Sequence, residues 1–401
     1  MDIFAGLQQA LTPAALLANC SGVALGIIFG SLPGLTAAMG VALLIPLSFG
    51  MPTVEAFSLL LGMYCGAIYG GCISAILVGT PGTVAAAATI LEGPKLTAKG
   101  QSLKAFDMAT WASFLGGTFS GVALVTCAPL LAMAAMRFGA PEYFALAVFA
   151  LTVVATFSSG NIVKGLAAAF FGLFLSSIGI DQISGDFRNT FNMPDLFSGI
   201  PLVPALVGLF AVSQVMLSLE DVFRGQFGIV KYGRLSNKGL ALKELLVQKF
   251  NLLRSSVIGT IIGIIPATGA SAACFIAYSE AKRHSATPEA FGTGTLEGIA
   301  ATESSNNAVT GGALIPMMVL GVPGDVLTAI LLGALMIQGL APGPLLFSEH
   351  STVVSGIFGS FFVAQAAMLV IGLLAVRVAG KIVHVPTPIL MPIVLVLCAI
   401  G

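Results

Sequence analysis

Residues 263–324 contain most of the side chains in this sequence that could bind a ligand. The stretch opens on GIIPATG (263–269), continues through EGIAATESSNN (297–307) and closes on GVPGD (321–325), with apolar runs on both sides. In hydrocarbon each unpaired backbone group costs several kcal/mol, so non-helical chain survives at membrane depth only where it is buried in protein or lines a wet cavity. We therefore interpret the stretch as a broken, polar binding segment inside an apolar protein.

Four consecutive polar residues lie at the centre of this segment: Ser304, Ser305, Asn306 and Asn307. Hydroxyl and amide groups can pair with substrate carboxylates, and their oxygens can coordinate a hard cation. We predict substrate binding by Ser304, Asn306 and Asn307, and a sodium site at Ser304, Ser305 and Asn306. A solvated loop at the start of a helix is the alternative.

Three carboxylates of the quoted motifs are candidates for ion coupling. Glu297 and Glu303 are candidates to bind a coupling ion or a proton, because ionisable groups at membrane depth are functional by default. Alternatively, both lie on the cytoplasmic surface. Asp325 directly follows a Pro-Gly pair, so it is either a third ion-coupling candidate or an N-cap.

Three Pro-Gly pairs are predicted to end helices and expose backbone N–H groups. A helix N-terminus carries roughly half a positive charge and suits a carboxylate. The alternative is a set of tight turns without a ligand. With the neighbouring hydroxyls and the end of GIIPATG, the predicted substrate site comprises, besides the central polar residues, Ser31, Pro33, Gly34, Thr36, Thr80, Pro81, Gly82, Thr268, Gly269, Pro323 and Gly324.

The composition places these residues in a membrane protein. Of 401 residues, 57% are hydrophobic and 8% are charged, against roughly a quarter charged in an ordinary soluble domain. The mean hydropathy is +1.01. The net charge of zero gives no indication of nucleic-acid binding, and the six cysteines lack metal or disulfide spacing. We expect an all-α polytopic membrane protein that inserts without a cleavable signal peptide.

The first elements read as a re-entrant hairpin, because residues 14–29 and 37–49 are each shorter than the ~20 residues that a full crossing needs. The segment 56–92 is apolar but interrupted at 69–71 and 79–82. Further spans are predicted at 105–136, 139–158, 161–180 and 199–218, with a polar loop at 182–198 and a basic loop at 220–254.

The distribution of Lys and Arg sets the topology. Their excess marks the cytoplasmic side, which places the lysines of 95–104 and the loop 220–254 inside. Both ends of a second hairpin, broken at 263–269, then also lie inside, whereas the N-terminus, Glu349 and His350 lie outside. The two hairpins therefore enter from opposite faces.

Ordered matches show that the two hairpins are related. Gly26, Gly30, Pro33 and Ala37 recur 233 positions later, and Gly70, Gly79, Pro81 and Gly82 recur 242 positions later. A repeat whose copies have opposite orientation is an inverted-topology repeat, the architecture of many secondary transporters, which hold substrate at the midplane with discontinuous helices. The alternative is chance matching of the abundant Gly and Pro.

These motifs resemble the large permease subunit of tripartite tricarboxylate transporters. The resemblance rests on GSLPGL (30–35), YGG (69–71) with TPG (80–82), EG (297–298) with ESSNN (303–307), and GLAPGP (339–344). It covers nearly the whole chain in order, and ESSNN is its most specific part.

The resemblance implies import of tricarboxylates or related carboxylates across the bacterial inner (plasma) membrane. It implies a small membrane subunit and a periplasmic solute-binding protein as partners, with a sodium or proton gradient as the driving force. This sequence departs from the family pattern at two places. Ala267 stands where many relatives carry Gly, and the sequence ends at Gly401 inside an apolar run. We therefore expect repeat units at 1–104 and 255–346, intervening helices at 105–219, the basic loop at 220–254, and a truncated C-terminal part at 347–401.

Other function classes fit less well. A channel, or an ion-coupled organic-anion transporter that works without a binding protein, is the alternative, although paired broken helices and inverted repeats favour alternating access. An enzyme is not expected, because the sequence contains no HExxH, GxSxG or P-loop pattern. No catalytic residue or organic cofactor is predicted.

Overall fold

The computed structural model describes residues 2–32, 35–157, 161–181, 185–223, 239–266, 268–375 and 377. The first part holds α1 (Ile3–Ala10), α2 (Pro13–Ser31), α3 (Ala37–Ser48), α4 (Thr53–Val78), the 3-10 turns η1 (Val84–Ala87) and η2 (Thr89–Leu91), and α5 (Gly93–Ala98). The middle part holds α6 (Ser102–Ala135), α7 (Ala140–Phe157), α8 (Ile162–Ser176), strands β1 (Gly179–Ile180) and β2 (Phe187–Arg188), η3 (Pro194–Leu196), α9 (Leu202–Leu206), the π-helix η4 (Val207–Val212) and α10 (Ser213–Phe223). The last part holds α11 (Leu242–Val247), α12 (Lys249–Ile264), α13 (Gly269–His284), η5 (Pro288–Ala290), α14 (Leu296–Leu320), α15 (Val326–Ile337), α16 (Leu345–Glu349) and α17 (Ser351–Ala375).

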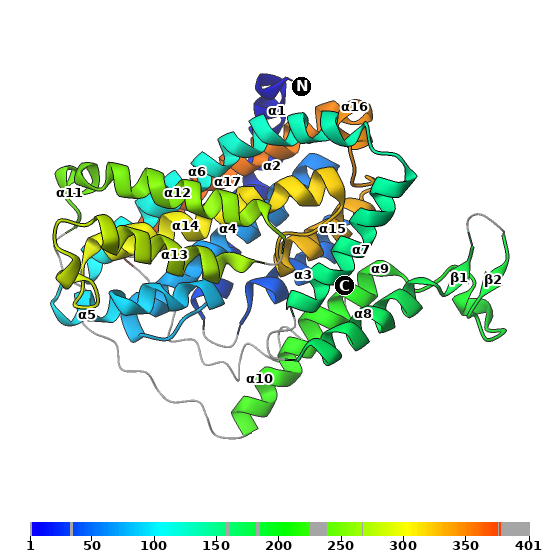
Figure 1. Cartoon of the computed structure of the whole chain (residues 1–401), viewed down its shortest axis with the longest axis horizontal. Helices are drawn as coiled ribbons and strands as arrows, with labels where there is room; N and C mark the ends of the chain where they lie inside the picture. The colour runs from blue at the N-terminus through cyan, green and yellow to red at the C-terminus, as the bar shows by residue number, and fades with distance from the viewer. Residues whose placement is uncertain are drawn as a thin grey trace.

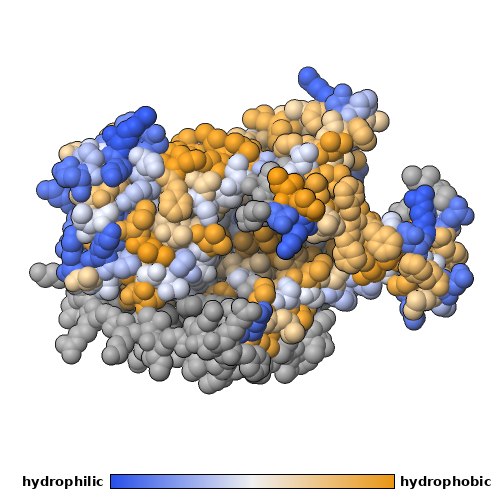
Figure 2. All heavy atoms as spheres, turned by 60° about the horizontal axis from the view of Figure 1, so that its bottom comes forward, coloured by the Kyte–Doolittle hydropathy of each residue, from blue (hydrophilic) through white to orange (hydrophobic). Residues whose placement is uncertain are grey.

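The predicted all-α membrane class is confirmed. Within the described ranges, α2, α4, α6 and α17 are long and apolar enough to cross a membrane. The two short strands pair antiparallel and project from one end of the molecule (Figure 1). Hydrophilic residues gather at both ends of the long axis, with an apolar surface between them (Figure 2), as expected for a protein whose middle faces lipid.

The first hairpin forms, but only its second arm is short: α2 is long and apolar enough to cross a membrane, contrary to the prediction. Glycines set the packing of the hairpin. Along α2, a Cβ added to Gly22, Gly26 or Gly30 would lie 2.1 to 2.5 Å from a carbonyl oxygen of α4, in the order Leu59, Met63 and Ala67. The two helices therefore run parallel with their backbones in contact. Helix α3 returns to the starting end, where Gln338 links it to the beginning of α4 by accepting from Thr53 Oγ1 and donating to the Ser48 carbonyl.

The second hairpin repeats this arrangement. Added Cβ atoms on Gly259 and Gly263 of α12 would lie 2.3 Å and 2.7 Å from the carbonyl oxygens of Ser305 and Val309 on α14. Helix α13 then returns, and Ser285 after its end donates to Glu297 in the first turn of α14. Elements α2, α3 and α4 thus correspond to α12, α13 and α14.

The two long helices end in the same way. Gly79 terminates α4 at φ 69° and ψ 19°, and Gly321 terminates α14 at φ 68° and ψ 17°. These left-handed conformations favour glycine, because a side chain there clashes with the backbone. Each glycine also faces a proline, Pro94 or Pro342, at 3.3 Å or 3.4 Å from an added Cβ. The equivalence predicted from sequence therefore extends to backbone torsion angles.

Helices α4 and α14 run in opposite directions. Going along the first half, Tyr64 bonds to Asp325, Ile68 to Asn306 and Thr89 to Thr302. The partner number falls as the residue number rises, so equivalent helices are antiparallel. This is the geometry of an inverted repeat.

The basic segments lie together at one end of the fold. Lys104 Nζ lies 2.5 Å from Glu244 Oε1, and Lys95 donates to the Gly292 carbonyl. Between them, the fully buried Glu92 accepts from the Tyr278 hydroxyl and from the backbone N–H groups of Gly292, Gly294 and Thr295. The three segments predicted to share one side of the membrane are therefore in contact.

Two predicted interruptions and one predicted loop take a different form. Residues 69–71 lie inside the continuous helix α4, and 297–307 lie inside the continuous helix α14. The basic loop 220–254 contains α11 and the start of α12, while 224–238 fall outside the described residues. The breaks at 79–82 and 321–325 are present. Buried glycines at 70 and 71 serve close helix packing rather than a turn.

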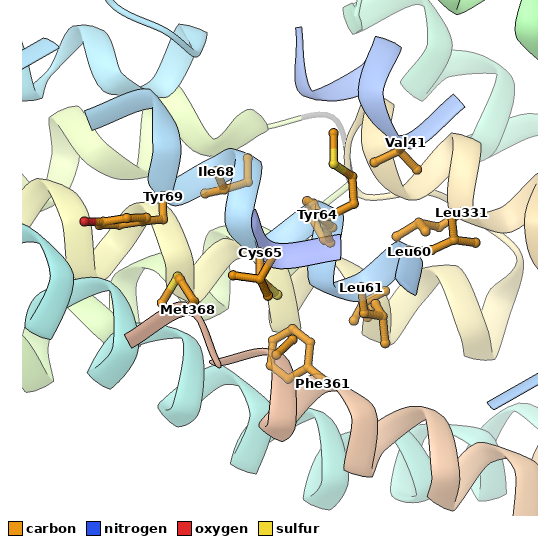
Figure 3. Close-up of a cluster of buried hydrophobic side chains, with 14 of the residues drawn as sticks. Val41, Leu60, Leu61, Tyr64, Cys65, Ile68, Tyr69, Leu331, Phe361 and Met368 are labelled. Carbon is orange, nitrogen blue, oxygen red and sulfur yellow. The ribbon is translucent and has the colours of Figure 1, made fainter. Parts of the chain in front are cut away.

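Helix α4 forms the centre of the core. Residues 56–77 along it are all buried. Its apolar side chains Leu60, Leu61 and Cys65 pack among Val41 of α3, Leu331 of α15 and Phe361 of α17 (Figure 3). Elements from both halves of the sequence therefore meet on one helix, which positions the site described next.

Candidate functional site

A cavity of 470 Å³ lies where the two hairpins meet. Both repeats contribute to its wall, together with the segment from η4 to α10. The lining residues are Thr36, Ala37, Ala38, Ile68, Gly82, Thr83, Val84, Ala85, Leu209, Phe210, Ser213, Gly269, Ala270, Ser271, Asp325, Val326 and Leu327.

Three helices begin at this cavity. The first residues of α3, α13 and α15 all line it. Thr36 caps α3 by accepting from the Met39 N–H at 3.1 Å, and Asp325 caps α15 by accepting from the Thr328 N–H at 2.7 Å. The remaining first-turn N–H groups have no intrahelical acceptor. Converging helix N-termini favour anionic groups without a basic side chain at membrane depth.

Backbone contact between the two breaks shapes the cavity. An added Cβ on Gly82 would lie 1.9 Å from the Gly30 carbonyl oxygen, so no side chain fits there. In the other repeat, Gly324 approaches Ala313 and the Gly263 carbonyl in the equivalent way. Each Pro-Gly segment is therefore packed onto the end of the adjacent hairpin arm.

Asp325 is the charged residue among the described lining residues. Its Oδ1 accepts from the Thr328 N–H and hydroxyl, each at 2.7 Å, and its Oδ2 accepts from the Tyr64 hydroxyl at 2.9 Å. Asp325 is thus an N-cap that also ties α15 to α4 across the repeat interface.

The structure brings some of the predicted substrate residues together. Thr36, Gly82 and Gly269 line the cavity with Asp325, whereas Pro33 and Gly34 fall outside the described residues. The other predicted residues lie elsewhere. Ser31 donates to the Ile28 carbonyl, and Thr268 donates to the Ile262 and Ile265 carbonyls. Thr80 and Pro81 are exposed, Pro323 is not a lining residue, and Gly324 packs against Ala313.

The central polar block is buried in protein rather than solvated. Ser304, Ser305, Asn306 and Asn307 are at most 1% exposed and lie inside α14. They do not line the cavity. The helix is unbroken because neighbouring helices supply partners: Asn306 Nδ2 donates to the Ile68 carbonyl and Asn307 Nδ2 to Ser113 Oγ, at 3.5 Å and 2.7 Å.

The two glutamates of α14 have different surroundings. Glu297 lies at the end with the basic segments and accepts from Ser285 at 2.7 Å. Glu303 is fully buried, and its Oε1 accepts from Thr89 Oγ1. Only Glu303 lies inside the protein among other polar side chains, namely Asn306 and Ser113.

Several lining residues could not be selected from their own sequence context. The lining residue Thr83, and Tyr64, which binds the lining residue Asp325, carried a usable signal, however, because they lie 242 positions before Asp325 and Asn306 and are therefore their repeat equivalents. Leu209, Phe210 and Ser213 come from a segment outside the repeat, and an apolar span gives no local sign of a cavity. Ser271 lies directly behind the predicted Thr268 and Gly269.

Comparison with known proteins identifies relatives over nearly the whole chain. The model of the tripartite tricarboxylate transporter TctA family matches residues 16–401. An "uncharacterized 52.8 kDa protein in TAR-I ttuC' 3'region" of Agrobacterium vitis is 34% identical over 396 residues, which is 99% of this chain and 78% of that protein. An "uncharacterized protein in TAR-II ttuC' 3'region" of the same organism is 32% identical over 143 residues, which is 36% of this chain and 59% of that protein. No solved structure matches this chain.

Proposed function

The chain belongs to the tripartite tricarboxylate transporter TctA family, and we propose that it is the permease through which a binding-protein-dependent secondary transporter imports carboxylates. Tricarboxylates or related carboxylates are the proposed solutes, and a sodium or proton gradient is the proposed driving force. A small membrane subunit and a periplasmic solute-binding protein are the proposed partners, in the bacterial inner membrane.

One observation carries the proposal: the N-termini of α3, α13 and α15 line a single cavity between antiparallel repeats. Each terminus offers backbone N–H groups to an anion. A solute with several carboxylates can therefore be held by both repeats at once. Because the two hairpins enter from opposite ends of the fold, displacement of one repeat against the other would open the cavity to alternate sides.

Asp325 supports coupling to a cation. A carboxylate in the cavity wall repels an anionic solute unless a positive charge is bound with it. Co-transport of a cation would remove that repulsion and favour inward movement of a polyanion. The cavity is thus better suited to symport than to passage of the free anion.

Uptake by proteoliposomes tests the proposal. The chain is reconstituted with its co-expressed membrane subunit and binding protein, and radiolabelled citrate and other tri- and dicarboxylates are supplied outside. We expect accumulation of at least one carboxylate when a sodium or proton gradient is imposed, each gradient being varied separately. Counterflow of labelled solute distinguishes a transporter from a channel. Absence of gradient-driven uptake of every carboxylate by the complete assembly would refute the proposal.

A further inference from the structure

We propose that Glu303, Asn306 and Asn307 on α14, together with Ser113 on α6, hold a sodium ion beside the transport cavity. The inference rests on the proposed function and deepens it, because it names the coupling ion and its ligands. The argument begins from oxygen atoms that the fold leaves without a partner.

The three α14 residues share one face of the helix. Their spacing of i, i+3 and i+4 places neighbouring side chains on the same side. Asn307 Nδ2 donates to Ser113 Oγ at 2.7 Å, and the side chains of Asn306 and Ser113 lie beside the Glu303 carboxylate. Thr89 fixes the carboxylate from the other side by donating to Oε1. The cluster is therefore assembled from two helices and the turn η2.

Three oxygens of this cluster have no hydrogen-bond partner among the described residues: Glu303 Oε2, Asn306 Oδ1 and Asn307 Oδ1. The amide orientations are set by the donors on the other branch. Asn306 Nδ2 points at the Ile68 carbonyl and Asn307 Nδ2 also reaches the Glu303 carbonyl, and a carbonyl oxygen can only accept. Asn306 Oδ1 and Asn307 Oδ1 are therefore the branches of the two amides that are left to accept a ligand.

The number of these oxygens favours a cation over a proton. A proton on Oε2 would satisfy that atom and one acceptor, which leaves a third buried oxygen unpaired at a cost of about 1 to 3 kcal/mol. A hard cation coordinates several oxygens at once. Glu303 forms no ion pair with the Lys, Arg or His residues that the structure describes. One buried negative charge among neutral ligands is balanced by a monovalent ion, whereas a divalent ion would leave an uncompensated buried charge.

The proposed ligands differ from those expected from sequence. Ser304 Oγ donates to the Ala301 carbonyl at 3.5 Å, so its hydroxyl is engaged along its own helix. Ser305 lies on the side of α14 that packs against Gly259 of α12. Neither residue belongs to the face of α14 that carries Glu303. Asn306 is therefore the one ligand shared by the sodium site predicted from sequence and the site proposed from the structure.

The site is next to the solute cavity. Ile68, whose carbonyl accepts from Asn306, is a lining residue. Thr83, whose buried Oγ1 is also without a partner, lines the cavity from the opposite repeat. A sodium ion at Glu303 would therefore place a positive charge behind the wall that faces the anionic solute, and each would strengthen binding of the other.

Binding of ²²Na⁺ to the purified full chain in detergent tests the site without solute or partner subunits. We expect saturable binding, a melting temperature that rises with NaCl but not with choline chloride, and at least a tenfold loss of sodium affinity in Glu303→Gln. The matched control is Glu297→Gln, which changes the other glutamate of α14 and should bind sodium like the unmodified chain. Asn306→Ala and Asn307→Ala should each weaken binding.

The outcomes separate the site from the proposed function. Absence of saturable ²²Na⁺ binding, or unchanged affinity in Glu303→Gln, would overturn the sodium site even if carboxylate uptake occurs. Stabilisation by acid but not by sodium would assign the cluster to a proton instead and would also overturn it. If Glu303→Gln does not fold, unchanged sodium affinity in both Asn variants would overturn the sodium site instead. Sodium binding without carboxylate transport would leave this site standing and refute the proposed function.

Discussion

The Tyr64 hydroxyl on α4 donates a 2.9 Å hydrogen bond to Oδ2 of Asp325, the residue that caps α15. The two residues are 261 positions apart and belong to opposite repeats. Asp325 is a lining residue of the cavity, whereas Tyr64 is not among the lining residues. A polar contact therefore joins the two repeats beside the cavity that we propose to hold the solute.

Tyr64→Phe should loosen this interface. A hydrogen bond to a charged acceptor contributes about 1.5 to 3 kcal/mol, and we expect a loss near the lower limit because Thr328 still binds the carboxylate. Thermal unfolding in detergent measures the loss. Tyr143→Phe, at an exposed tyrosine, is the control and should unfold like the unmodified chain. Equal stability of the Tyr64 variant would show that the bond contributes nothing to holding the repeats together.

Gly82→Ala should displace the first hairpin. The added methyl would lie 1.9 Å from the Gly30 carbonyl oxygen and 3.0 Å from Gly71 Cα, both backbone atoms that cannot rotate away. We expect loss of solute uptake together with a lower melting temperature, and Gly82→Val should be worse. Gly50→Ala, where nothing lies within 4 Å, should be silent. Normal uptake by Gly82→Ala would contradict the close approach of the two breaks.

Asn307→Ala should alter the sodium requirement for solute binding rather than solute affinity itself. Asn307 is buried and does not line the cavity, so its effect must pass through the ion. By linkage, the variant should need at least tenfold more sodium for half-maximal solute binding and should approach normal affinity at saturating sodium. Solute titrations at several NaCl concentrations measure both. A reduced affinity that sodium does not restore would instead indicate direct contact with the solute.

Cysteine labelling should place the contacting basic segments on the cytoplasmic side. With exposed Cys127 changed to Ser, a cysteine at Gln101 or Thr287 should resist an impermeant maleimide applied from the periplasm. A cysteine at Ser348 should react. All three positions are exposed, and the reverse pattern would invert the assigned topology.

Acid should release α11 from α6. The hydrogen bond from Lys104, with that from the Ala241 N–H, holds the pKa of Glu244 below its ordinary value of about 4.5. A lowered pKa contributes stability that is present above pH 4.5 and is lost as pH falls through the folded value. Because both side chains are partly exposed, this contribution is about 1 kcal/mol or less.

The single tryptophan reports this release. Trp111 lines a 430 Å³ pocket together with Leu245 and Leu246 of α11. We expect a red shift of its fluorescence on acidification, and the same shift already at neutral pH in Glu244→Gln. The hydrogen bond from the Leu240 N–H to Asp107 also holds the segment before α11 against α6. Asp107→Asn measures the contribution of this second bond separately. An unchanged spectrum in Glu244→Gln would show that the ion pair does not position α11.

The repeat was predictable from sequence because glycine and proline impose geometry directly. Gly79 and Gly321 adopt left-handed torsion angles within a few degrees of each other. Because such positions favour glycine, the same residue type recurs at them in the sequence. The hairpin arms were predictable for the same reason, since glycines mark the backbone contacts. Composition alone settled the class of protein.

The polar block was harder to place. Its Ser and Asn residues are locally typical of a helix break, but α14 is continuous, and the amide NH2 groups of Asn306 and Asn307 donate to partners on α4 and α6. Those partners lie 238 and 194 positions away. Only the assembled fold shows that Asn306 and Asn307 face Glu303 rather than the cavity. The part of the wall formed by Leu209 and Phe210 depends on equally distant contacts.

The glycine rows between α2 and α4, and between α12 and α14, determine where the molecule can bend. Backbones that touch through Gly22, Gly26 and Gly30 cannot slide, because any shift drives a carbonyl oxygen into the neighbouring chain. Each hairpin arm and its long helix must therefore move as one rigid body. If one repeat moves against the other as proposed, the motion should therefore occur at the surface between these two bodies, which hydrogen bonds such as Tyr64 to Asp325 and Asn306 to Ile68 hold together.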